Sequence, residues 1–135
     1  MTGLVLVRSL YDHGARPVYR YEVLLAADGD AVWDGTVCER RQGRFTGRFD
    51  PASFEPLVQS VLDAPLVRRI AAGGTLGMYG AHNDTAIIRV IQGGGRTVRV
   101  GHPFVFRDSN PETALALQVD SIEAFAETID WRPFH

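Results

Sequence analysis

Hydrophobic and polar side chains alternate along residues 17–26, PVYRYEVLLA. The period of two predicts a half-buried strand, with Tyr19, Tyr21, Val23 and Leu25 on one face. Asp28-Gly29 predicts a tight turn, because glycine adopts positive φ without a Cβ clash. A second strand is expected from Ala31 to Cys38. The opposite face of the first strand carries Arg20 and Glu22, so we expect it to be the wetter face of an antiparallel sheet.

Other apolar runs predict further strands around this hairpin. Leu4 to Arg8 is a short apolar run that we expect to pair with the hairpin, and Arg44 to Phe49 predicts a fourth strand. A second hairpin is expected from Thr85 to Gln92 and Arg96 to Val100, because three consecutive glycines between them form a turn.

Two cap-and-proline pairs predict helix starts. Asp50-Pro51 and Asn110-Pro111 each combine a good N-cap with a proline at the first helical position. Pro65 interrupts the first helix, and residues 66–72 form a further turn or two. Apolar residues at helical spacing give each helix one hydrophobic face. These residues are Phe54, Leu57, Val58, Val61 and Leu62 in the first helix, and Leu115, Val119, Ile122, Ala126 and Ile129 in the second.

The order of these elements is strands, helix, hairpin, helix. Runs of strands separated by single helices predict an α+β fold. We expect an antiparallel sheet of about five to six strands, with two helices on one face. The chain has 135 residues, of which 45% are hydrophobic, which suits a single domain over residues 1–135.

Composition narrows the class of protein. No apolar window is long enough for a membrane span, and the first residues do not form a secretory signal. The single cysteine, Cys38, cannot form an internal disulfide, so we expect a cytoplasmic protein. The net charge of −2 argues against general attraction to nucleic acid. All fourteen basic residues are arginine, which we attribute to the codon usage of a GC-rich genome rather than to function.

Short motifs in order along the chain resemble an uncharacterised bacterial domain family of unknown function. Members of that family open with a strand ending near R-S and then C-x-G-x-C-P-x-Y. A D-G hairpin with Y-x-G or W-x-G, an F-x-x-L helix, an aspartate loop and a final helix ending near Trp follow. The matching residues here are Arg8-Ser9, Gly14, Pro17-Val18-Tyr19, Asp28-Gly29, Trp33, Gly35, Phe54, Leu57, Asp84 and Trp131.

The resemblance spans nearly the whole chain but departs at one corner. The two family cysteines fall at Asp12 and Arg16, which suggests that an ion pair replaces a disulfide or a thiol pair there. An exposed ion pair contributes only about 0–1 kcal/mol. The resemblance implies the fold and transfers no catalytic residues.

Residues 73–84, GGTLGMYGAHND, hold the candidate small-molecule site. Tyr79, His82 and Asp84 are the candidate ligand-binding residues, since histidine titrates near neutrality and an aspartate orients it. The simpler interpretation is a loop whose polar residues cap turns. Neither a metal-ligand spacing nor a phosphate-binding loop is present, so we expect no metal and no cofactor.

Arg40, Arg41, Arg44 and Arg48 form the one basic cluster, with two phenylalanines interleaved. We rank a solvated hairpin first, with the phenylalanines in the core. Contact with an acidic protein surface is second, within one molecule or across a homodimer. The acidic flank of the last helix offers such a surface, with Asp120, Glu123, Glu127 and Asp130. Single-stranded nucleic acid is third.

The sequence contains no catalytic set, which favours a protein without enzymatic activity. We therefore expect a protein-interaction module that uses the sheet face or the arginine-rich hairpin, and an inhibitor of the immunity type is one example. The alternative is a small-molecule or enzymatic site under the glycine-rich loop 73–84.

Overall fold

The computed structural model describes residues 2–11, 17–37, 41–71, 84–93, 97–103 and 116–134. The strands are β1 (Gly3–Tyr11), β2 (Pro17–Ala26), β3 (Asp30–Val37), β4 (Gly43–Arg48), β5 (Asp84–Ile91), β6 (Thr97–Pro103) and β7 (Arg132–Pro133). The helices are a 3₁₀ turn, η1 (Pro51–Ser53), followed by α1 (Phe54–Leu62), α2 (Pro65–Ala71) and α3 (Ala116–Glu127).

All seven described strands form one antiparallel sheet in the order β6-β5-β1-β2-β3-β4-β7. This confirms the α+β class with an antiparallel sheet. The expected five to six strands are too few, because Arg132 and Pro133 form a short extra strand against β4. Strand β1 joins the two hairpins, since Val5 lies opposite Leu24 of β2 and Arg89 of β5.

Prolines and one aspartate set the helix boundaries. The Asp50 side chain accepts a hydrogen bond from the Ala52 N–H at 3.0 Å, so it caps the turn as expected. The first three residues are 3₁₀, however, and the α-helix proper begins at Phe54. Pro65 begins a separate helix, so the structure has three α-helices in its described part where two were expected.

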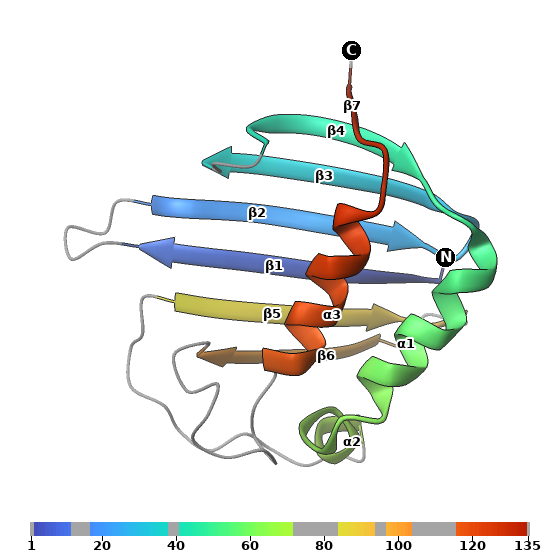
Figure 1. Ribbon diagram of the computed structural model, residues 1–135. Coiled ribbons are helices and arrows are strands. Elements are labelled where there is room, and N and C mark those ends of the chain that lie inside the picture. Colours follow the sequence, from blue (N-terminus) through green and yellow to red (C-terminus); the bar gives the residue numbers. More distant parts are fainter. Residues whose placement is uncertain are drawn as a thin grey trace.

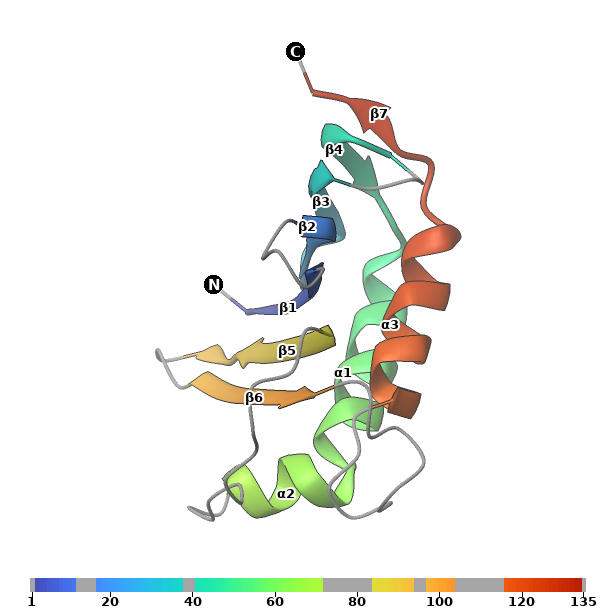
Figure 2. The ribbon, with the colours of Figure 1, turned by 90° about the vertical axis from the view of Figure 1, so that its left-hand side faces the viewer.

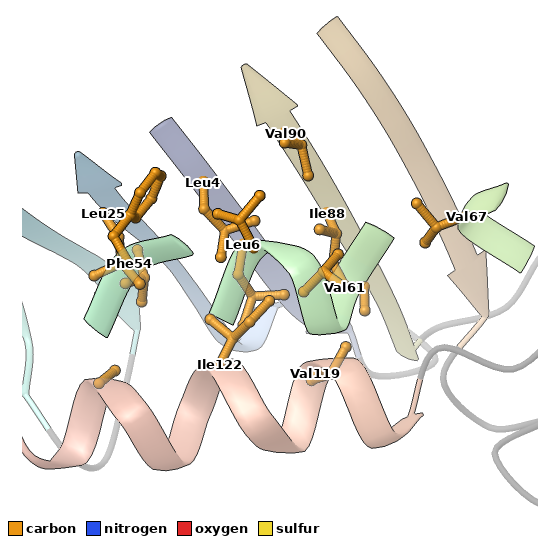
Figure 3. Packing of buried hydrophobic residues seen from close by; sticks show 14 of the residues in the cluster. Leu4, Leu6, Leu25, Phe54, Val61, Val67, Ile88, Val90, Val119 and Ile122 are labelled. Atoms are coloured by element: carbon orange, nitrogen blue, oxygen red, sulfur yellow. The ribbon is translucent and has the colours of Figure 1, made fainter. Parts of the chain in front are cut away.

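The helices lie on one side of the sheet (Figures 1 and 2), with α1 and α3 crossing its face and α2 beside β6. Apolar residues of alternate strand positions fill the space beneath them, and Figure 3 shows this packing. The expected apolar stripe is confirmed for Val119, Ile122 and Ala126 of α3 and for Ile129 just after it, which are all buried. Leu115 and the expected helix start at Asn110-Pro111 lie outside the described residues. Burial contributes roughly 1.5–3 kcal/mol for each large apolar side chain before entropy is subtracted.

Candidate functional site

The face of the sheet that points away from the helices carries no described element (Figure 2). Strand register defines its side chains, because residues directly opposite in an antiparallel pair point to the same side. We call this surface the open face. Its described side chains are, strand by strand, Thr97 and Arg99 of β6; Ile87, Arg89 and Ile91 of β5; Val5, Val7 and Ser9 of β1; Arg20, Glu22, Leu24 and Ala26 of β2; Asp30, Val32, Asp34 and Thr36 of β3; and Arg44, Thr46 and Arg48 of β4.

Apolar side chains form the middle of the open face. Val5 is only 3% exposed, but the apolar residues around it keep part of their surface in contact with solvent. These half-buried residues are Val7, Leu24, Val32, Ile87 and Ile91. The alternation in β2 anticipated this arrangement, because Arg20 and Glu22 lie on the same side and Arg20 is exposed. The result is a half-buried apolar area that one charged residue, Arg89, interrupts, because it lies between Ile87 and Ile91 on β5 and opposite Val5.

Two hollows indent the open face over β2 and β3. One of about 380 Å³ is lined by Thr2, Leu24, Ala26, Ala27, Asp28, Asp30 and Val32. The other, of about 230 Å³, is lined by Glu22, Leu24, Val32, Asp34 and Arg44. A third, of about 670 Å³, follows β3 and β4 toward Arg132.

Two cross-strand charge pairs of the open face have like sign, whereas Asp34–Arg44 and Asp30–Arg48 have opposite sign. Arg89 of β5 lies directly opposite Arg99 of β6, and Glu22 of β2 lies directly opposite Asp34 of β3. None of these four forms an ion pair with another described residue. Like charges in opposite positions destabilise a sheet, typically by a few tenths of a kcal/mol or more. The chain therefore maintains two unfavourable pairs on the one face that the helices leave uncovered.

On the helix side, Arg8 and Glu123 form a buried polar contact that joins the sheet to α3. Arg8 is 6% exposed, and its Nη1 lies 3.2 Å from Oε1 of Glu123. The hydroxyl of Tyr21, opposite Arg8 in the register, donates a hydrogen bond to the same carboxylate. This cluster was not predicted from the sequence. A signal was present, because Arg8 shares the inward face of its strand with Leu4 and Leu6.

Arg41 belongs to a second cluster under α3. Its guanidinium carbon lies 4.5 Å from the ring centroid of Trp33, and Nη2 lies 3.3 Å from Oε2 of Glu127. Trp33 in turn stacks on Tyr21 with centroids 4.6 Å apart, and its indole N–H donates to the Arg41 carbonyl oxygen at 3.0 Å. The expected pairing of the arginine cluster with the acidic flank of the last helix thus occurs within one molecule at Arg41–Glu127.

The structure divides the predicted basic cluster instead of gathering it in one patch. Arg41 is held under α3, whereas Arg44 and Arg48 lie on β4 at the margin of the open face. Arg48 pairs with Asp30, its cross-strand neighbour. Arg40 lies outside the described residues. Phe45 and Phe49 pack against the core, as the solvated-hairpin interpretation expects.

The candidate small-molecule site falls almost entirely outside the described residues. Tyr79 and His82 lie there, as do Cys38 and the Asp12–Arg16 corner. The backbone of Asp84 begins β5 opposite Leu10, but its side chain is not among those that the structure describes. Among the described residues no group of three or more acidic, histidine or cysteine side chains is placed to hold a metal ion. No helix in the same set is long and apolar enough to cross a bilayer.

Comparison with known proteins adds no relative to this picture. No family model matches the chain, and no curated protein matches it significantly. A functional interpretation therefore depends on the geometry of the open face and of the two polar clusters. Of these, the open face alone presents a large surface to solvent.

Proposed function

We propose that the protein is an interaction module that binds another protein through the open face of its sheet. The observation that carries this proposal is the uncovered face itself, where Val7, Leu24, Val32, Ile87 and Ile91 remain partly accessible. A contiguous exposed apolar area rimmed by polar residues is typical of protein–protein interaction sites. A sheet face of this kind usually packs against a second layer, because burial of its apolar side chains stabilises the assembly.

The charged residues of the open face contribute more to the specificity of partner recognition than to binding affinity. Both signs are present on the open face, with Arg89 and Arg99 on one side and Glu22 and Asp34 on the other. A partner with the reverse arrangement is attracted in a single orientation, since like charges in contact oppose other orientations. The hollow lined by Glu22, Asp34 and Arg44 has room for a polar side chain of such a partner.

The test compares matched variants. Leu24→Glu places a charge in the apolar centre of the open face, and Leu117→Glu places the same charge on α3 at a side chain that is already 76% exposed. Partners are captured with the wild-type protein, purified, and their dissociation constants measured with each variant. We expect Leu24→Glu to weaken binding by roughly tenfold or more, since losing one buried apolar anchor costs about 1.4 kcal/mol or more. Equal binding by both variants would refute the proposal.

A further inference from the structure

We infer that the partner of the open face is a second copy of this chain, bound face to face about a two-fold axis. This inference rests on the proposed function and names the partner of the same surface. Its basis is the position of the two like-charge pairs, Arg89–Arg99 and Glu22–Asp34, on either side of strand β1. Each pair is unfavourable within one chain and complementary to the other pair.

The strand order makes the face complementary to itself. The basic pair belongs to β5 and β6, and the acidic pair to β2 and β3, so the two pairs flank β1 symmetrically. When the two-fold axis runs along β1, β5 of each copy lies over β2 of the other, and β6 lies over β3. A two-fold interface uses the same patch on both subunits, so each contact occurs twice. Sheets that pack face to face are commonly aligned within about 30°.

Register places each arginine close to an acidic side chain of the other copy. Arg89 lies in the same cross-strand row as Val5 and Leu24, so in the pair it meets Leu24. Glu22 is two residues away on that strand, about 7 Å along it, within reach of an arginine side chain. It lines the 230 Å³ hollow with Leu24, and this hollow therefore receives the guanidinium of Arg89.

The outer arginine has a matching position. Arg99 occupies the row of Arg89 and lies over Val32 of the other copy. Val32 stands between Asp30 and Asp34 on β3, so acidic groups flank the guanidinium on both sides. Asp30 is already paired with Arg48, which leaves Asp34 as the main partner of Arg99. At the axis, the β1 side chains Val5 and Val7 meet their own copies.

The remaining arginines of the open face lie at the edge of this arrangement, and one of them, Arg44, also lines the 230 Å³ hollow. Arg44 and Arg48 lie on β4, which extends beyond the overlap because β6 ends the sheet on the other side. The guanidinium carbon of Arg44 is 5.0 Å from the ring centroid of Phe134, and no ion pair joins it to Asp34, its cross-strand neighbour. Arg20 falls in the row of Ser9, beyond the rows that hold Arg89 and Glu22.

The overlap is large enough for a dimer of moderate stability. Five strands spaced about 4.8 Å apart, each contributing about eight residues of 3.3 Å, give a footprint of roughly 600 Å² per copy. The total of about 1,200 Å² lies at the lower end of specific, stable interfaces. We therefore expect dissociation on dilution and in high salt, where exposed charge pairs are screened.

Charge exchange between two variants tests this arrangement. The first variant carries Arg89→Glu and Arg99→Glu, and the second carries Glu22→Arg and Asp34→Arg. Each alone brings like charges together twice, so self-association weakens by roughly 100-fold, because like-charge contact costs several kcal/mol. An equimolar mixture restores a dimer of twice the 14.9 kDa chain mass, since an acidic face then meets a basic one. A variant with Arg68→Glu and Arg69→Glu on α2 is the matched control and dimerises like the wild type.

Sedimentation equilibrium over a concentration series measures the association state of the wild type, the two open-face variants, the α2 control and the mixture. Circular dichroism verifies that each protein is folded. A wild-type protein that is monomeric at every concentration overturns the inference. So does a dimer that the two open-face variants leave intact, or one that their mixture fails to restore. If the wild type is monomeric while Leu24→Glu still abolishes binding to a different protein, the inference fails and the proposed function stands.

Discussion

The ion pair between Arg8 and Glu123 is the contact whose removal is expected to change stability most sharply. The two side chains are 7% and 19% exposed, so the charges are largely removed from water. Glu123→Gln keeps the size of the side chain and removes its charge beside the guanidinium. Loss of one partner from a buried pair costs about 3–5 kcal/mol. Because Glu123 keeps some contact with solvent, we expect a loss of about 3 kcal/mol.

Urea unfolding followed by tryptophan fluorescence measures this change. Trp33 stacks on Tyr21, which itself bonds to Glu123, so its emission reports on this part of the core. The midpoint should fall while the slope with urea stays constant, because the same surface is exposed on unfolding. In a thermal scan the same loss corresponds to a shift of roughly 10 °C for a domain of this size.

A matched variant separates burial from charge. Asp130→Asn removes the carboxylate of the Asp130–Arg132 pair, in which both side chains are 80% exposed, so we expect less than about 1 kcal/mol. The double variant Arg8→Met/Glu123→Gln removes both buried charges and retains an acceptor for Tyr21. It should recover much of the lost stability. If Glu123→Gln costs no more than Asp130→Asn, the inferred burial of the charge pair is wrong.

Two further predictions follow from local geometry. Gly29 and Gly43 both have positive φ, but a Cβ at Gly29 would lie 2.6 Å from a backbone carbonyl oxygen whereas one at Gly43 meets nothing within 4 Å. In urea unfolding Gly29→Ala should therefore cost more than Gly43→Ala, which carries only a backbone strain of about 1–3 kcal/mol; equal costs would refute the clash. Side-chain hydrogen bonds, first from Gln59 and second from Arg68, lower the pKa of the Asp63 carboxyl group. The contribution of Asp63 to stability is therefore present above its unfolded pKa, and it is lost as the pH falls through the lower pKa of the folded state. In an NMR titration Gln59→Ala should raise this pKa, and an unchanged value would contradict the assignment.

The local pattern of the sequence predicts most strands and both faces of the first hairpin. Alternation places Tyr21 and Val23 inward and Arg20 outward, and the structure confirms it. The order of the strands in the sheet does not follow from this local pattern, because the position of β1 between β2 and β5 depends on pairing between segments far apart in the chain. The two-residue strand β7 is too short to give a periodic signal.

The site was predictable only in part, for a related reason. Clustering of Arg41, Arg44 and Arg48 in the sequence suggests one basic surface. Arg44 and Arg48 share the open face of β4, but Arg41 precedes that strand and pairs with Glu127 of α3 on the other side. Arg41 lies under α3 because Trp33 and Glu127 hold it there, and Glu127 is distant in sequence. The like-charge pairs of the open face emerge only once strand register is known.

The short strand β7 also bears on how the protein avoids aggregation. An unpaired outer strand is a template for the addition of strands from other chains, and β4 would be one without β7. Phe45 and Thr46 instead lie opposite Pro133 and Arg132, and the N–H of Phe134 donates to the Arg44 carbonyl oxygen at 2.9 Å. Proline has no N–H to continue the ladder, and the exposed charge of Arg132 disfavours a further strand. Residues 132–134 thus oppose the addition of a further strand along the part of the β4 edge that they cover, residues 44–46.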